Sequence, residues 1–140
     1  MNTRASFPIY GTAFPFSARA AVVNMGLTYA SHYIDDRRFP EDNKQPEIRE
    51  EIRLCPFLGS LKESLDAYDL TAPTYFYAFY FGLEYAKKIK NQTIIFPHIP
   101  VNVPSIGECV LTYVERDDMC YLCLPPHDFS FSRDAYVAGI

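Results

Sequence analysis

Four side chains in this 140-residue sequence have the types and surroundings that proton transfer requires. Glu84 is the one acid in the aromatic run FYAFYFGLEY, where burial would favour its neutral form and suit it to act as an acid or base. His98, His127 and Asp128 lie in proline-bounded segments near expected strand ends, where catalytic groups often occur. The alternative for Glu84 is an ordinary surface pair with one of the lysines that follow it. No nucleophile pattern such as G-x-S-x-G accompanies these residues.

A second group of side chains has the types that bind zinc. Cys120 and Cys123 form a C-x-x-C pair, which Cys109 precedes and His127 follows, so the ligand types of a Cys3His site are present. However, the surrounding sequence MCYLCL has the composition of a strand, on which residues three apart point to opposite faces. We therefore expect neither a metal site nor a cofactor, and we interpret the cysteines as small buried side chains.

Three tyrosines of the aromatic run, Tyr75, Tyr77 and Tyr80, are the candidate binding residues. Drawn as a helix, the run is apolar nearly all round, and such a helix is usually covered on two sides. The alternative is an exposed aromatic face that docks another protein. Tyrosine is enriched at protein interfaces, so the sequence leaves the buried and the docking interpretations open.

Helix signals around the run outweigh the preference of aromatic residues for strands. Thr71 can cap a helix, Pro73 suits its first turn, and three lysines crowd the far end, where the helix dipole favours cations. One apolar stripe recurs at helical spacing, formed by Phe76, Phe79, Leu83, Ala86 and Ile89. The pattern predicts a central helix over 73–90, followed by a buried strand at 93–96.

Serine, glycine and proline positions predict the remaining elements. We expect a strand at 7–12, a helix at 17–25 that stops at Gly26, and a strand at 27–34. A continuous helix to residue 34 is the alternative, because apolar residues keep helical spacing across the glycine. The other expected elements are helices at 46–55 and 58–70, a hairpin of strands 108–114 and 119–124, and a tail that packs at a sheet edge.

These elements predict an α+β fold with several helices on one face of a small, mainly antiparallel sheet. The chain is long enough for one globular domain over residues 1–140, and 49% of its residues are hydrophobic. A net charge of −4 without a basic cluster argues against nucleic acid as a partner. No apolar run is long enough to span a membrane, and no signal segment begins the sequence, so we expect a cytoplasmic protein.

Two segments resemble parts of known enzyme families, each over less than a fifth of the chain. Residues 9–34, IYGTAFPFSARAAVVNMGLTYASHYI, look like the first strand–helix–strand unit of glutathione-transferase-like thioredoxin folds. The later Cys55-Pro56-Phe57 loosely resembles the proline loop of those folds. Residues 81–96, FGLEYAKKIKNQTIIF, resemble the glutamate-bearing helix and following strand of nucleoside deoxyribosyltransferases. That resemblance implies Glu84 as a nucleophile.

Two functions follow from these observations. The first is a small acidic protein-binding domain of the inhibitor, immunity or adaptor type, which acts through an aromatic-rich surface on a protein partner or on a second copy of itself. The second is an enzyme on a small molecule, such as a nucleoside- or glycoside-type hydrolase or transferase, using Glu84 with a loop histidine. The lack of a convincing catalytic set and the many tyrosines favour the first.

Overall fold

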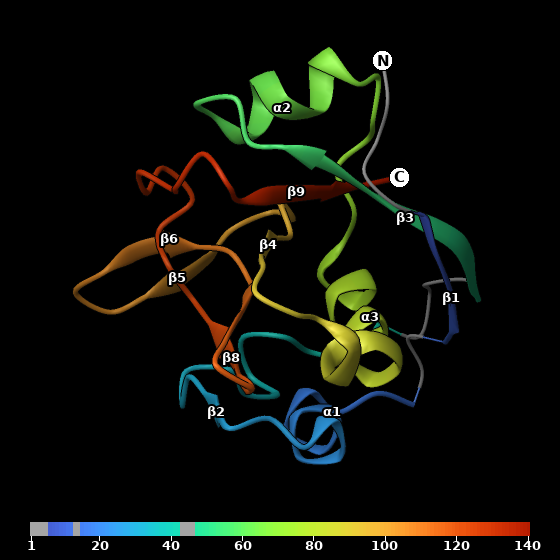
Figure 1. The fold of residues 1–140 in the computed structure, drawn as a ribbon. Coiled ribbons are helices and arrows are strands. Elements are labelled where there is room, and N and C mark those ends of the chain that lie inside the picture. Colours follow the sequence, from blue (N-terminus) through green and yellow to red (C-terminus); the bar gives the residue numbers. More distant parts are fainter. Residues whose placement is uncertain (1–5, 13–14, 43–46) are drawn as a thin grey trace.

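A computed structural model describes residues 6–12, 15–42 and 47–140. Its main feature is a mixed seven-stranded sheet that curls around a central helix (Figure 1). In chain order the elements are β1 (Ser6–Gly11), α1 (Ala18–Met25), β2 (Tyr29–Ala30), β3 (Ile48–Pro56), α2 (Leu61–Ala67), α3 (Tyr75–Tyr85), a 3-10 turn (Ala86–Lys88), β4 (Thr93–Ile95), β5 (Val101–Val103), β6 (Gly107–Cys109), β7 (Thr112–Arg116), β8 (Met119–Cys123) and β9 (Tyr136–Gly139).

The strand order of the large sheet is β1-β3-β9-β4-β7-β8-β2, and β5 with β6 forms a separate hairpin. The β4–β9 and β2–β8 pairs are parallel, and the other pairs are antiparallel. The expectation of a small, mainly antiparallel sheet is therefore wrong. The C-terminal strand β9 lies between β3 and β4 in the interior of the sheet, so the expected edge position of the tail is wrong as well.

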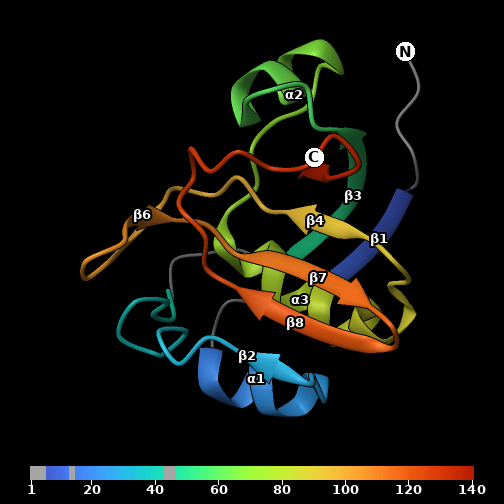
Figure 2. The same ribbon diagram turned by 60° about the vertical axis from the view of Figure 1, so that its left-hand side comes forward.

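The helices do not share one face of the sheet, which corrects the second part of the predicted fold. Helix α3 lies in the concavity, α1 packs mainly on α3, and α2 packs on β3 and β9 from the other side (Figure 2). Neighbouring strand residues belong to two different cores: Leu54 joins the core around α3, and Cys55 joins the core under α2. Successive strand side chains point to opposite faces, so the sheet is covered on both.

The predicted helix at 46–55 is also wrong, because the described part of this segment is strand β3. Ile48 and Ile52 have the spacing of one helical face, but they also belong to an alternating pattern with Leu54. All three are buried, whereas Arg49 and Arg53 between them are exposed. Pairing with β1 on one side and β9 on the other decides between the two patterns, because tertiary contacts override weak local preferences.

The N-terminal helix α1 forms as the sequence predicts. The Ser17 hydroxyl accepts from the Ala20 N–H at 3.1 Å, and the helix stops at Gly26, whose φ of 68° is left-handed. The chain then makes only the two-residue strand β2, so most of the predicted strand at 27–34 is absent. Strands β1 and β2 lie at opposite edges of the sheet. The strand–helix–strand unit that the thioredoxin resemblance implies is therefore not formed.

Helix α3 is central, and most of its surface is buried, although Leu83 and Glu84 remain exposed. Phe79 and Phe81 are fully buried, and the Tyr113 hydroxyl of β7 donates to the Ala78 carbonyl at 2.8 Å. The helix is shorter than predicted because Thr74 stands at its N-terminus and a 3-10 turn follows Tyr85. The predicted hairpin forms between β7 and β8, but its first strand covers 112–116 and not 108–114, because Gly107–Cys109 pairs with β5. Its turn uses two aspartates with positive φ, where the sequence has no glycine.

Candidate functional site

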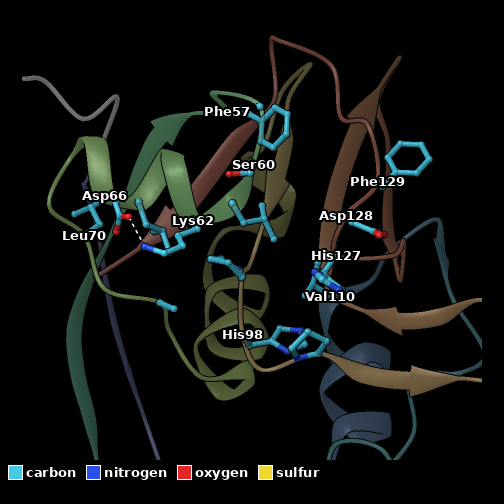
Figure 3. A pocket seen from close by; sticks show the side chains of 16 residues that line it. Phe57, Ser60, Lys62, Asp66, Leu70, His98, Val110, His127, Asp128 and Phe129 are labelled. Carbon is cyan, nitrogen blue, oxygen red and sulfur yellow. Dashed lines mark hydrogen bonds and ion pairs between the residues drawn. The ribbon is translucent and has the colours of Figure 1, made fainter.

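A cleft of about 660 Å³ opens between α2 and the chain segments around residues 98 and 128 (Figure 3). One wall is the exposed side of α2, and the opposite wall is the segment that follows β8. The floor is apolar and belongs to the core under α2. The residues that line it include Phe57, Lys62, Leu65, Asp66, Leu70, His98, Val110, His127, Asp128 and Phe129.

Helix α2 is fixed at its N-terminus, and it is too short to close the cleft. The Ser60 hydroxyl accepts from the Glu63 N–H at 3.1 Å, and the Ser64 hydroxyl donates to the Ser60 carbonyl at 2.7 Å. Lys62 and Asp66 form an ion pair of 2.6 Å along the exposed side. Seven helical residues cover only part of the second core, so the neighbourhood of Leu65 borders an open space.

The opposite wall is held by backbone hydrogen bonds to β6 and the residue after it. The Val110 N–H donates to the Pro125 carbonyl at 3.0 Å, and the His127 N–H donates to the Glu108 carbonyl at 2.9 Å. This pairing presents the side chains of His127, Asp128 and Phe129, all exposed, toward the cleft.

A second hollow of about 590 Å³ adjoins the first and shares Phe57 and Gly59 with it. It is also lined by Pro56, Leu58, Ser130, Phe131 and Arg133. Phe131 contacts Phe57 and Phe129 edge to face, with ring centroids 5.6 and 5.1 Å apart. These three rings form a phenylalanine cluster along both hollows. We call the two hollows together the α2 groove.

Large apolar side chains are exposed beside the α2 groove. Leu58 is 46% exposed, Phe129 is 53% exposed, and Ile99, which follows His98, is 88% exposed. Isolated exposed apolar residues are common on soluble proteins, but a contiguous patch marks a surface that binds something.

His98 lines the first hollow but is committed to structural contacts. Its ring is 2% exposed and meets Phe39 edge to face. The Leu111 N–H donates to Nε2 at 2.9 Å, so the proton of the neutral ring is on Nδ1, which donates to the Ile99 carbonyl at 2.8 Å. Burial lowers the pKa of His98 to about 4, although the bond to Ile99 opposes that change. Both nitrogens are occupied, so His98 is poorly placed for proton transfer.

The buried His98 makes stability depend on pH in a defined direction. Its pKa of about 4 in the folded protein lies below the ordinary 6.5, so the unfolded chain binds more protons between these values. Stability is therefore complete above pH 6.5 and falls as the pH drops toward 4, by about 2 kcal/mol between pH 7 and pH 5.

We expect His98→Gln, which keeps a donor and an acceptor but does not titrate, to lose about 2 kcal/mol less than the wild type over this interval. Urea unfolding of both proteins at pH 7 and pH 5 measures the difference. Equal losses in the two proteins would contradict this assignment of His98.

The other predicted site residues lie away from the α2 groove. Glu84 is exposed on α3 and is not among the residues that line the groove. Tyr77 is buried, and Tyr75 and Tyr80 are half-buried. The Tyr75 hydroxyl donates to the Pro40 carbonyl. Burial raises the pKa of all three tyrosines. Of the predicted residues, the structure therefore brings together only His98, His127 and Asp128.

Sequence reasoning missed the residues that give the groove its apolar character. Phe57 follows the strand that was predicted as a helix, and Phe129 and Phe131 lie in a tail expected at a sheet edge. The alternation of Phe129 and Phe131 was a usable signal, but it does not indicate which segment lies opposite. Segments far apart in sequence form the two walls, and only the folded chain juxtaposes them.

The cysteines are distributed over separate elements. Cys120 and Cys123 lie on β8, Cys109 ends β6, and Cys55 is buried in β3. Burial raises the pKa of each thiol, and the Asp128 carboxylate adds to the effect at Cys109. Within the described ranges, no group of three or more His, Cys, Asp or Glu side chains is arranged to hold a metal ion.

No protein-family model, curated protein or solved structure matches this chain. Among the described residues, no helix is both long and apolar enough to cross a membrane.

Proposed function

We propose that this protein is a protein-binding domain of the inhibitor, immunity or adaptor type, which takes an extended segment of a partner protein into the α2 groove. One observation carries the proposal: the exposed apolar side chains beside α2 border two adjoining hollows and not a single closed pocket. In this proposal the aromatic-rich surface that binds the partner is the phenylalanine cluster, and not the tyrosines of α3.

The dimensions of the groove favour a chain segment over a small molecule. Pockets for small ligands usually enclose about 300–1,000 Å³ and bury most of the ligand. Each hollow alone falls within that range, at about 660 Å³ and about 590 Å³, but the two adjoin at Phe57 and Gly59 and together exceed it. Leu58, which lines the second hollow, is also exposed. An extended peptide can fill successive hollows with alternate side chains.

The arrangement gives less support to a small-molecule enzyme. Glu84 lies on α3 outside the groove, and the nitrogens of His98 are occupied by backbone partners. His127 and Asp128 remain as neighbours on one exposed segment, and the charged groups on the opposite wall, Lys62 and Asp66, are paired with each other. Reduced thiols at the four free cysteines fit the cytoplasmic location that we expect.

A library of random decapeptides displayed on phage, selected on the immobilised protein, tests the proposal. We expect enriched peptides rich in apolar residues, whose affinity falls at least about tenfold in Phe129→Ser, because exposed aromatic anchors carry much of the energy of such interfaces. Leu83→Ser is the matched control, since Leu83 is 42% exposed but lies on α3 away from the groove. Affinity is measured by fluorescence anisotropy with resynthesised peptides.

Three results would contradict the proposal. They are the enrichment of no peptide, equal binding to the wild type and Phe129→Ser, and equal losses in Phe129→Ser and Leu83→Ser. Sedimentation velocity of the protein alone tests self-association, and a dimer that Phe129→Ser abolishes would assign the groove to a second copy of the chain.

A further inference from the structure

The two hollows of the α2 groove carry opposite charges at their rims. The charged groups that line the first hollow are Lys62, Asp66 and Asp128, together with the titratable His127. The ion pair of 2.6 Å between Lys62 and Asp66 neutralises both. Asp128 forms no ion pair with any other described residue, so it supplies the uncompensated charge of the first hollow.

Arg133 is the charged side chain that lines the second hollow. It is exposed, and within the described ranges it has no carboxylate partner. Among the residues that line the groove, the first hollow therefore has an uncompensated negative side chain and the second a positive one, although the whole protein carries a net charge of −4.

We infer that the partner segment is dipolar: an extended apolar stretch with a basic side chain at the end that lies by Asp128 and an acidic side chain at the end that lies by Arg133. This inference rests on the proposed function, because it names the partner chemistry of the same groove. Exposed charges contribute modestly to affinity, but complementary pairs fix the orientation and the register of a bound chain.

The spacing of the two charges limits the length of the segment. Asp128 and Arg133 are five positions apart, so their Cα atoms are at most about 17 Å apart. An extended chain rises about 3.4 Å per residue, so at most about four residues separate the two charged side chains of the partner. Alternate members of that stretch point into the groove and need to be apolar.

Five blocked peptides test the inference. All five contain the apolar core of one peptide obtained from the phage selection, and they differ only in the residue at each end. The N-terminal and C-terminal residues are Lys and Glu, Glu and Lys, Lys and Lys, Glu and Glu, or Gln and Gln. We expect one of the two dipolar peptides to bind about three- to tenfold more tightly than the Gln peptide, because each exposed pair contributes up to about fivefold. That preference falls as salt is raised, since exposed charges are screened.

Charge reversal in the protein gives the sharpest test. Asp128→Lys shifts the preference to the peptide with two glutamates, and Arg133→Glu shifts it to the peptide with two lysines. The double variant prefers the dipolar peptide that the wild type disfavours. The controls are Glu84→Lys and Arg37→Glu, which make the same charge changes at exposed positions that do not line the groove.

The outcomes separate this inference from the proposed function. If all five peptides bind equally well and Phe129→Ser weakens each of them, the groove binds peptides but has no charge preference, and the inference is overturned. If the controls change the preference as much as the groove variants do, the effect is one of net charge, which also overturns it. If no peptide is enriched at the start, the proposed function itself fails.

Discussion

Replacing Phe79 with alanine is expected to lower the free energy of unfolding by about 3–5 kcal/mol. The ring is fully buried at the centre of the concavity. Its centroid lies 5.2 Å from that of Phe16 and 5.4 Å from that of Phe39, both in edge-to-face contact. Truncation leaves a cavity among rings that belong to three different segments, and such a site collapses poorly.

Urea unfolding monitored by circular dichroism measures the loss. Leu83→Ala, on the same helix but 42% exposed, is the matched control and is expected to lose less than about 1 kcal/mol. A loss below about 1 kcal/mol in Phe79→Ala would show that α3 does not hold the curled sheet together. In that case the description of α3 as the central element would be wrong.

The second large effect is expected at Gly82, where α3 lies against Tyr113 of β7. A Cβ added there would overlap the Tyr113 hydroxyl and lie 2.7 Å from Met25 Sδ. Tyr113 is fully buried and donates to the Ala78 carbonyl, so it cannot move without losing that bond. Gly82→Ala is expected to cost about 2–4 kcal/mol, although alanine is intrinsically the better helix residue by about 1 kcal/mol.

A double-mutant cycle identifies the cause of this loss. Tyr113→Phe removes the hydroxyl that the new methyl group would overlap, so Gly82→Ala should be much less damaging in the Tyr113→Phe background. Chemical denaturation of the four proteins gives the coupling energy. If Gly82→Ala stabilised the wild type, or if the two changes were additive, the close approach between α3 and β7 would not exist in solution.

The α2 groove could be predicted only in fragments. Proline-bounded segments single out His127 and Asp128, and the structure places both in the lining of the groove. The same reasoning predicts His98 as a candidate catalytic residue, but its ring is buried and both ring nitrogens are hydrogen-bonded to backbone groups. Glu84 is a candidate acid or base in the sequence because it is the one acid within an apolar run, but the structure leaves its side chain exposed to solvent. A sequence pattern shows how apolar a helix is, but it does not show which side of each turn the sheet will cover.

The sequence by itself determined the elements whose signals are local. Ser17 and Gly26 set the ends of α1, the run at 75–85 became a helix, and the segments around the turn at Asp117 and Asp118 became a hairpin. In each of these cases, the interactions that decide the structure lie within a few residues of one another along the chain, so they can be read without knowing the fold.

Only the tertiary structure decided the rest. Residues 48–56 fit a helix or a strand locally, and hydrogen bonding to β1 and β9 selected the strand. The C-terminal β9 lies in the sheet between β3 and β4, and α2 packs on β3 and β9 over the second core, beside the groove. Non-local pairing joins residues up to about 90 positions apart, such as Tyr29 and Tyr121. A periodicity measured within one segment carries no information about which distant segment will lie beside it.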